Sequence, residues 1–207
     1  MTRFGYFLSS EEHDVASLLH QAELAERAGF SALWVSDHFH PWNHAQGQSP
    51  FVWSVLGALA ERVSLPITTA VTCPTVRIHP AVIAQASATV AAMMPGRFTL
   101  GIGSGEALNE CVLGDAWPEA DVRLEMLEEA VEVIRALHTG EVISHRGRHY
   151  TTQHAKIFTL PETLPEIFIS AFGPKSLELA GRIGDGFITT KPDAEAIQAF
   201  RDAGGTG

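Results

Sequence analysis

Two polar segments of this chain could carry out proton chemistry, and each follows a short apolar run typical of a buried strand. Asp37 and His38 follow one such run, and Glu106 and Asn109 follow another. A carboxylate beside an imidazole suits acid–base catalysis, because histidine titrates near neutral pH. The carboxyl ends of parallel strands gather at one edge of an α/β sheet, where ligands bind. The sequence therefore predicts a site built from at least two strand ends, although a loop histidine bonded to a backbone carbonyl is the alternative for His38 alone.

Glycines mark two strand ends. Gly101, Gly103 and Gly105 alternate, so the backbone there could approach a ligand closely and offer N–H groups to a phosphate. Their spacing differs from the G-x-G-x-x-G dinucleotide fingerprint. The turn Phe172–Ser176 is a second glycine-containing passage from strand to helix, and the helix start could bind an anion.

The loop after Asp37 offers two further interpretations. His38, His40 and His44 could ligate a metal, but a metal site needs ligands from other strand ends, and residues 171–173 and 189–191 contain no histidine. We therefore expect no metal. Trp42 could form a wall against a flat ring or a sugar, and a plain loop anchor is equally consistent with its position.

The composition of the chain limits the classes of molecule that it is expected to bind. The chain has 207 residues, 45% of them hydrophobic, and a net charge of −10 from 14 basic and 24 acidic side chains. Such acidity disfavours nucleic acid and anionic lipid and also favours solubility. No apolar run approaches about 18 residues, and the amino terminus lacks the apolar core of a signal peptide. Cys73 and Cys111 lie far apart and are expected to be reduced thiols, so we expect a cytoplasmic protein with a small-molecule substrate.

Strand and helix patterns alternate along the chain without a linker, which predicts one domain over residues 1–207. Asp14 is expected to cap the first helix and Gly29 to end it. The expected strands are 4–8, 32–35, 67–72, 98–102, 167–171 and 186–190; the expected helices begin near 14, 49, 80, 121, 175 and 193, and a hairpin of 141–144 with 149–151 interrupts the alternation.

Near-continuous apolar strands favour a parallel sheet covered on both faces. Either an open doubly wound sheet or a (β/α)8 TIM-barrel fits this α/β pattern. A closed barrel needs eight units and about 250 residues, whereas only about six βα units are present. The chain ends in the glycine-rich residues 204–207, and we expect that the last two barrel units are absent.

Four segments together resemble the luciferase-like barrel oxidoreductases (the LLM class) that use the deazaflavin coenzyme F420, and most closely the F420-dependent glucose-6-phosphate dehydrogenase group. These segments are Ser36–Trp42, Pro74–Gln85, Gly103–Glu110 and Gly184–Phe187. The resemblance covers nearly the whole chain. It implies an incomplete TIM barrel of the bacterial luciferase-like type and a cis peptide bond between Ala70 and Val71.

The resemblance also implies the chemistry, which is hydride transfer between a hydroxyl-bearing carbon and C5 of the deazaflavin. His38 would be the base for the substrate hydroxyl, Glu106 would protonate ring nitrogen N1, and Trp42 would orient the substrate. Members of the family often dimerise, so a homodimer is a further expectation. The residues expected to hold the cofactor are Asp37, Ala70, Val71, Cys73, Gly103, Ser104, Gly105, Asn109, Gly173, Pro174 and Ser176.

The chain departs from the sugar-phosphate enzymes near Thr190 and Lys191, which are the expected substrate-binding residues. Asp193 stands where those enzymes place a phosphate-gripping lysine, and an aspartate repels phosphate. A different alcohol, a sugar or an aldehyde is therefore an equal expectation for the substrate. Two alternatives stay open, namely an FMN-dependent luciferase-like monooxygenase and a truncated chain that binds cofactor but catalyses nothing.

Overall fold

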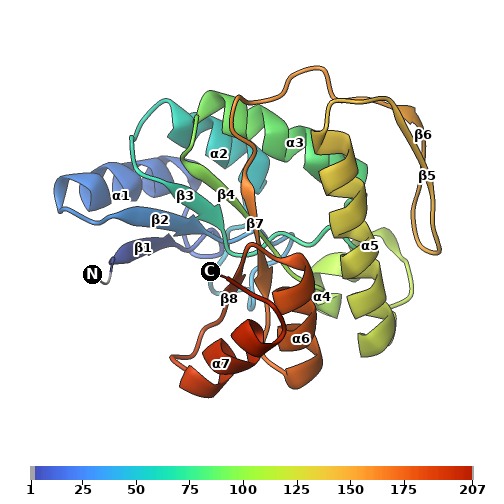
Figure 1. Cartoon of the computed structure of the whole chain (residues 1–207). Coiled ribbons are helices and arrows are strands. Elements are labelled where there is room, and N and C mark those ends of the chain that lie inside the picture. The colour runs from blue at the N-terminus through green and yellow to red at the C-terminus, as the bar shows by residue number, and fades with distance from the viewer. Residues whose placement is uncertain (1–2, 207) are drawn as a thin grey trace.

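A curved sheet of six parallel strands forms the framework of the structure, a computed structural model that describes residues 3–206 (Figure 1). Met1, Thr2 and Gly207, which belong to the expected amino-terminal segment and the glycine-rich end, lie outside the described residues. Neighbouring strands follow chain order across the sheet, from β1 to β8. The strands are β1 (Gly5–Leu8), β2 (Ala32–Val35), β3 (Ile67–Thr69), β4 (Phe98–Ile102), β7 (Glu166–Ser170) and β8 (Gly186–Ile188).

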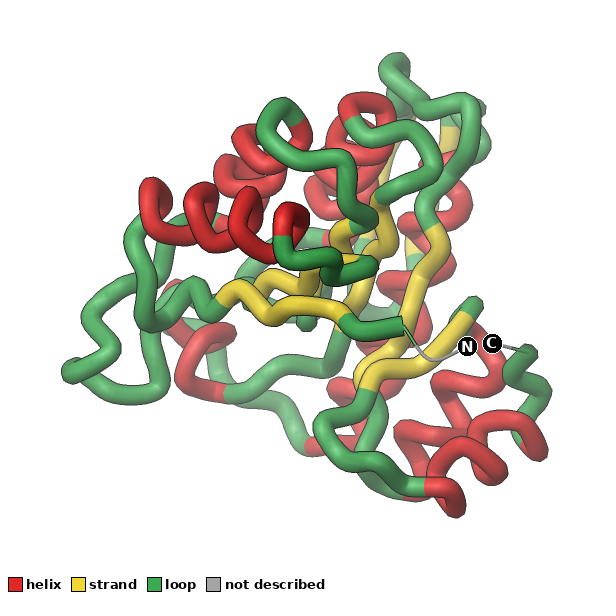
Figure 2. The backbone as a smooth tube through the Cα atoms, turned by 90° about the vertical axis from the view of Figure 1, so that its left-hand side faces the viewer, coloured by secondary structure: helices red, strands yellow, loops and turns green. Residues whose placement is uncertain are grey.

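Six longer helices, α1, α2, α3, α5, α6 and α7, form one layer around the outer side of this sheet (Figure 2). Each helix packs against the next, so that α1 contacts α2, α2 contacts α3, α3 contacts α5, α5 contacts α6 and α6 contacts α7. The bounds are α1 (Val15–Arg27), α2 (Val52–Ala60), α3 (Pro80–Met93), α4 (Ala107–Glu110), η1 (Cys111–Leu113), α5 (Ala120–His138), α6 (Pro174–Ile183) and α7 (Ala194–Asp202).

This arrangement decides between the two predicted architectures. A doubly wound sheet reverses its strand order at a switch point, whereas these strands run in sequence order throughout. The partial TIM barrel is therefore confirmed, and the open doubly wound sheet is excluded. The inner face keeps exposed aromatic surface, since the side chain of Phe7 on β1 is 51% exposed.

Most predicted elements lie within a few residues of their expected bounds. Asp14 caps α1 by accepting a hydrogen bond from the Ser17 backbone N–H at 2.8 Å, as predicted. Helix α2 begins at Val52 and not at Pro50. The hairpin consists of β5 (Ile143–Arg146) and β6 (Thr151–Ala155), so its turn lies later than expected, and it lies outside α5 (Figure 1).

Two differences matter for the site. Strand β3 ends at Thr69, the peptide bond between Ala70 and Val71 is cis, as predicted, and Thr72 pairs with Ile102 as an isolated bridge. The short helices α4 and η1 were not predicted, because segments this short show no helical periodicity. They place residues 106–113 over the carboxyl ends of the strands.

A continuous apolar core fills the space between the sheet and the helices. The strands contribute Leu33, Ile67 and Leu100, and the helices contribute residues such as Leu56 and Ile134, all of them without exposed surface. Burial of this kind contributes about 25 cal/mol for each Å² of apolar area. Within residues 3–206, none of the helices has the length and apolar character needed to cross a membrane.

Candidate active site

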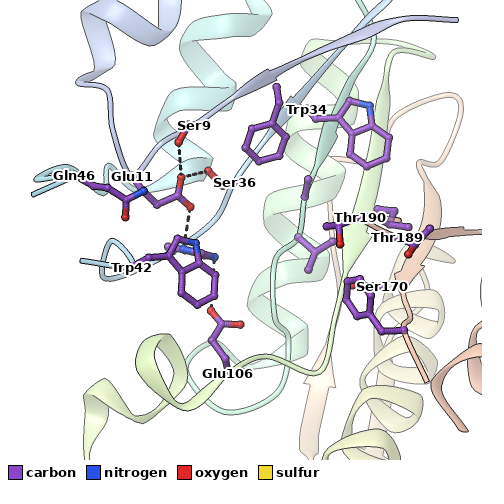
Figure 3. A pocket seen from close by; sticks show the side chains of 16 residues that line it. Ser9, Glu11, Trp34, Ser36, Trp42, Gln46, Glu106, Ser170, Thr189 and Thr190 are labelled. Carbon is purple, nitrogen blue, oxygen red and sulfur yellow. Dashed lines mark hydrogen bonds and ion pairs between the residues drawn. The ribbon is translucent and has the colours of Figure 1, made fainter. Parts of the chain in front are cut away.

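A cavity of about 620 Å³ opens at the carboxyl ends of the strands, on the inner face of the half-barrel (Figure 3). Its walls include four large aromatic side chains and its polar groups come from several strand ends, which is typical of a small-molecule site. The aromatic lining is Phe7, Trp34, Trp42 and Phe172, and the remaining lining is Ser9, Glu11, Ser36, His38, Gln46, Ala70, Val71, Glu106, Ser170, Ile188, Thr189 and Thr190.

Glu11, which is buried, and His38, which is partly exposed, form a pair on one wall of this cavity. Nδ1 of His38 lies 2.9 Å from Oε1 of Glu11, and only 4% of the Glu11 side chain is exposed. The contact is off the N–H axis, so charge holds the pair more than a linear hydrogen bond does. The Ser36 and Ser9 hydroxyls donate to Oε2 of Glu11 at 2.8 and 3.1 Å. The Glu11 carboxylate is therefore fixed from both sides.

The pairing shifts the pKa of both groups. Burial favours neutral Glu11, but the contact with His38 and the hydrogen bond from Ser36 outweigh it and lower the pKa of Glu11 from 4.5 to about 2. Burial also favours a neutral imidazole, yet Glu11, and then the charges of Glu106 and Asp37, raise the pKa of His38 above its ordinary value of 6.5. The acceptor at Nδ1 leaves Nε2 of His38 directed away from Glu11.

Glu106 faces the other nitrogen of His38. Its Oε1 lies 3.6 Å from Nε2 of His38, and 37% of its side chain is exposed to the cavity. Asn109 donates to this carboxylate oxygen at 2.5 Å, and its own carbonyl accepts from the Phe39 and His40 backbone N–H groups at 2.8 and 2.7 Å. Asn109 thus ties α4 to the loop after β2, and the sequence-predicted residues His38, Glu106 and Asn109 lie together.

Trp42 lies against this pair from the cavity side. Its ring meets the His38 ring edge to face, with centroids 4.9 Å apart and an angle of 81° between the planes. The Trp42 side chain is 60% exposed. It therefore covers one side of His38 while keeping free aromatic surface for a ligand.

Three further predicted residues line the cavity, namely Ala70, Val71 and Thr190. Ala70 and Val71 carry the cis peptide bond at the end of β3. Gly103 lies close behind them, since a Cβ atom there would be 2.9 Å from the Val71 side chain. The lack of a side chain at position 103 therefore leaves room for Val71 in the cavity wall, although Gly103 itself does not line the cavity.

Asp37 and Cys73 were predicted to hold the cofactor, but both are buried behind the cavity wall. Asp37 accepts a hydrogen bond from the Thr72 hydroxyl and another from Nη2 of Arg77 at 3.1 Å. Cys73 is 5% exposed, and burial raises the pKa of its thiol well above 9.0. These side chains support the site without facing the described cavity.

The other predicted cofactor residues lie beside the cavity and not on its surface. Gly105 has a positive φ of 80°, and with Ser104 it forms the turn that leads into Glu106. Gly173, Pro174 and Ser176 form the start of α6. The Ser176 hydroxyl accepts there from the Phe172 and Gly173 backbone N–H groups at 3.1 Å each and caps the helix.

The segment after β8 explains why an aspartate, Asp193, stands where the sugar-phosphate enzymes are expected to have a lysine. Lys191 is exposed and does not line the cavity. Asp193 caps α7, because its Oδ1 accepts from the Glu195 and Ala196 backbone N–H groups at 2.9 and 3.2 Å. The carboxylate is therefore committed to the helix start.

Several residues around the site were not predicted from the sequence, among them Glu11, Ser36, Gln46 and Arg77. Glu11 follows the end of β1 within three residues, so the strand-end argument applied to Asp37 would have found it. Arg77 gave no such signal, because it lies in the turn before α3 and reaches its partners only in the folded chain. Over residues 3–206, His, Cys, Asp and Glu side chains form no group of three suited to a metal ion.

Comparisons with known proteins agree with this geometry. A family model described as luciferase-like monooxygenase matches residues 1–203. The chain is 45% identical over 196 residues to the F420-dependent glucose-6-phosphate dehydrogenase of Nakamurella multipartita, covering 94% of this chain and 58% of that protein. For the protein of the same name from Microbacterium testaceum, the identity is 47% over 189 residues, covering 91% and 56%.

Among solved structures, an F420-dependent secondary alcohol dehydrogenase in complex with an F420-acetone adduct superposes with a TM-score of 0.92. The two chains are 36% identical, and the match covers 99% of this chain and 66% of that one. This chain therefore spans little more than half the length of the curated relatives it matches. By its family model, its strand order and its strand-end cavity, the chain belongs to the luciferase-like monooxygenase family.

Proposed function

We propose that this chain carries most of the active site of an F420-dependent oxidoreductase that transfers a hydride between a hydroxyl-bearing substrate and the deazaflavin. One observation carries the proposal: Glu11, His38 and Glu106 form a line of proton-carrying groups along an aromatic-walled cavity. The named activities of the similar proteins point the same way. An alcohol or a sugar phosphate is the substrate class that these relatives suggest.

The residues present fit such a cofactor. A flat tricyclic ring needs apolar walls and a few fixed polar groups, and the cavity offers Trp34, Phe7 and Phe172 together with Ser9, Ser170 and Thr189. Its volume of about 620 Å³ lies in the range of cofactor sites. The cis peptide bond between Ala70 and Val71 contributes a further part of the wall. The bound deazaflavin would supply a carbon that accepts or returns the hydride.

His38 is the group suited to move the hydroxyl proton. The Glu11 carboxylate beside Nδ1 favours the tautomer that carries its proton on that nitrogen, so Nε2 remains free to accept one. Glu11 then stabilises the imidazolium that forms. Glu106 is the second proton-carrying group, because its carboxyl is partly exposed to the cavity and is held in place by Asn109.

The charges around the cavity favour an uncharged alcohol. Among the residues described, no lysine or arginine lines the cavity, whereas Glu11 and Glu106 both do. A phosphate group would meet these carboxylates without a compensating cation. The acidic Asp193 cannot act as that cation, and its carboxylate caps the start of α7. We therefore propose a secondary alcohol as the first substrate to test.

Titration of the 207-residue chain with oxidised F420, and separately with FMN, tests the proposal. We expect saturable quenching or enhancement of F420 fluorescence at micromolar concentration, and no saturation with FMN. Turnover is then followed as loss of deazaflavin absorbance with 2-propanol and with glucose 6-phosphate. Saturation by FMN alone, or by neither compound in a sample with a cooperative melt, would contradict the proposed function.

Glu11→Gln is expected to lower the pKa of His38 and to move the acid limb of the pH–rate profile to lower pH. The introduced amide keeps the shape and an acceptor oxygen but removes the negative charge that raises the pKa of His38. The rate of alcohol oxidation against pH measures the limb, and the imidazole NMR signal of His38 against pH measures the pKa directly. Glu12→Gln is the matched control, because Glu12 is exposed and adjacent. Equal His38 titration in both variants would contradict the pairing.

The same pair gives folding stability a defined pH window. The raised pKa of His38 stabilises the fold fully below about pH 6.5. This stabilisation is lost as the pH rises through the raised pKa of His38. The lowered pKa of Glu11 stabilises the fold fully above about pH 4.5. This stabilisation is lost as the pH falls through about 2, the pKa of Glu11 in the folded chain. Glu11→Gln should therefore lower the unfolding free energy most between pH 4.5 and 6.5.

Three broader proposals accompany this function. One continuous core runs from β1 to α7, which supports treating residues 1–207 as a single partial TIM-barrel domain. Cys73 and Cys111 are free thiols, which suits the reducing cytoplasm. Association into a homodimer follows from the family resemblance, and the mass of the chain in solution tests it.

A further inference from the structure

Arg77 joins three segments behind the cavity wall. Its Nη2 donates to Oδ1 of Asp37 at 3.1 Å, and its Nε donates to Oε1 of Glu110 at 3.5 Å. Its backbone N–H donates to the other oxygen of Glu110 at 2.9 Å. The exposed fractions of the three side chains are 7%, 0% and 1%. A buried guanidinium therefore bridges the end of β2 and the end of α4.

None of these three residues lines the cavity, yet Asp37 and Glu110 each adjoin a segment that does. Asp37 immediately precedes His38. Glu110 ends α4, the helix that begins directly after Glu106. The bridge therefore fixes the two backbone segments whose side chains face one another at 3.6 Å, from Nε2 of His38 to Oε1 of Glu106.

The charge balance makes Arg77 hard to replace. Two buried carboxylates share a single guanidinium, and burial raises the pKa of Glu110 although Arg77 opposes the shift. Only a planar fork donates in two directions from a fixed geometry, whereas a lysine ammonium offers one point of charge. A lysine at position 77 would keep the charge but could not hold both partners.

The turn that carries Arg77 is itself anchored. The Tyr150 hydroxyl, at the hairpin turn, lies within hydrogen-bond distance of the Pro74 and Thr75 carbonyl oxygens, at 3.1 and 2.9 Å. The Tyr150 backbone N–H donates in turn to Glu129 on α5 at 2.8 Å. Arg77 is therefore presented to its partners from a fixed backbone.

We propose that Arg77 is a positioning residue that holds the His38 and Glu106 segments at their facing distance by bridging Asp37 and Glu110. The inference rests on the proposed function for its consequence, since the cofactor would bind against these two segments. It needs no contact between Arg77 and any ligand. Supporting residues of this kind set the geometry that catalytic groups require.

The test compares Arg77→Lys with the matched control Arg62→Lys, which alters an exposed arginine that pairs with Glu23. In Arg77→Lys we expect hydrogen exchange at the Phe39 and His40 amides to rise about tenfold, because their acceptor Asn109 lies on α4. Affinity for F420 should fall by about tenfold to a hundredfold. The pKa of His38, followed by NMR, should fall as Glu106 moves away.

Glu110→Gln is the second variant, because the amide nitrogen of the introduced glutamine cannot accept a hydrogen bond from Arg77. It tests the positioning role if Arg77→Lys does not fold. The proposal is overturned if the folded variants match Arg62→Lys in amide exchange, His38 titration and F420 affinity. If the wild-type chain binds no F420 but exchange and titration change in Arg77→Lys, the positioning role stands and the proposed function fails.

Discussion

His38→Ala is expected to lower the rate of hydride transfer about 10²- to 10⁴-fold while leaving F420 affinity within a few-fold. The substitution removes the base at Nε2 and leaves Glu11 without its partner at 2.9 Å. The cavity walls that would hold the cofactor ring, such as Trp34 and Phe172, remain. Stopped-flow measurement of deazaflavin reduction, combined with fluorescence titration, separates the two effects.

His40→Ala is the matched control, because His40 lies two residues away, is exposed and does not line the cavity. Its rate should stay close to that of the wild type. An equal loss in both variants would mean that the loop, and not the imidazole of His38, is responsible. Full activity in His38→Ala would assign the base to another group.

Gly101→Ala is expected to destabilise the fold by about 3 kcal/mol or more, enough to prevent a cooperative melt in a marginal protein. A Cβ atom at this position would overlap the Thr69 carbonyl oxygen and lie 2.7 Å from the Ile188 side chain. The Thr69 hydroxyl also donates to the Gly101 carbonyl at 2.8 Å and lies 2.9 Å from its N–H, so a shift of the backbone would break the join of β3 to β4.

Gly173→Ala serves as the control for this change. A Cβ atom there would meet nothing within 4 Å, and the φ of −111° is open to any residue. We expect a change of at most about 1 kcal/mol, the effect of alanine at a helix start. Thermal unfolding followed by circular dichroism compares both variants, and similar melting of the two would show that the sheet can absorb the added methyl group.

At Gly101 the glycine pattern correctly predicted a close approach of the backbone, but to a different partner. The alternating glycines predicted a close approach to a ligand, but at Gly101 the close approach is to the neighbouring strand. A sequence shows that a Cβ atom is absent, and it does not show what occupies the space. Only the register of β3 against β4 places Thr69 there.

Local patterns determined the alternation of strands and helices and the strand ends that carry Asp37, His38 and Glu106. Apolar periodicity, the Asp14 cap and the proline at the start of α3 act within one or two turns of chain, so they can be recognised without the fold. The number of units likewise indicated an incomplete barrel. The roles of the predicted cofactor residues remain predictions.

The tertiary structure alone decided which of these groups meet. The pairing of Leu8 with Val35 in parallel strands brings the residues after β1 beside those after β2, and so places Glu11 against His38. The bridge from Arg77 to Glu110 spans 33 residues and depends on where α4 lies over the strand ends. Contacts of this kind follow from register and packing between distant segments, and no pattern of neighbouring residues specifies them.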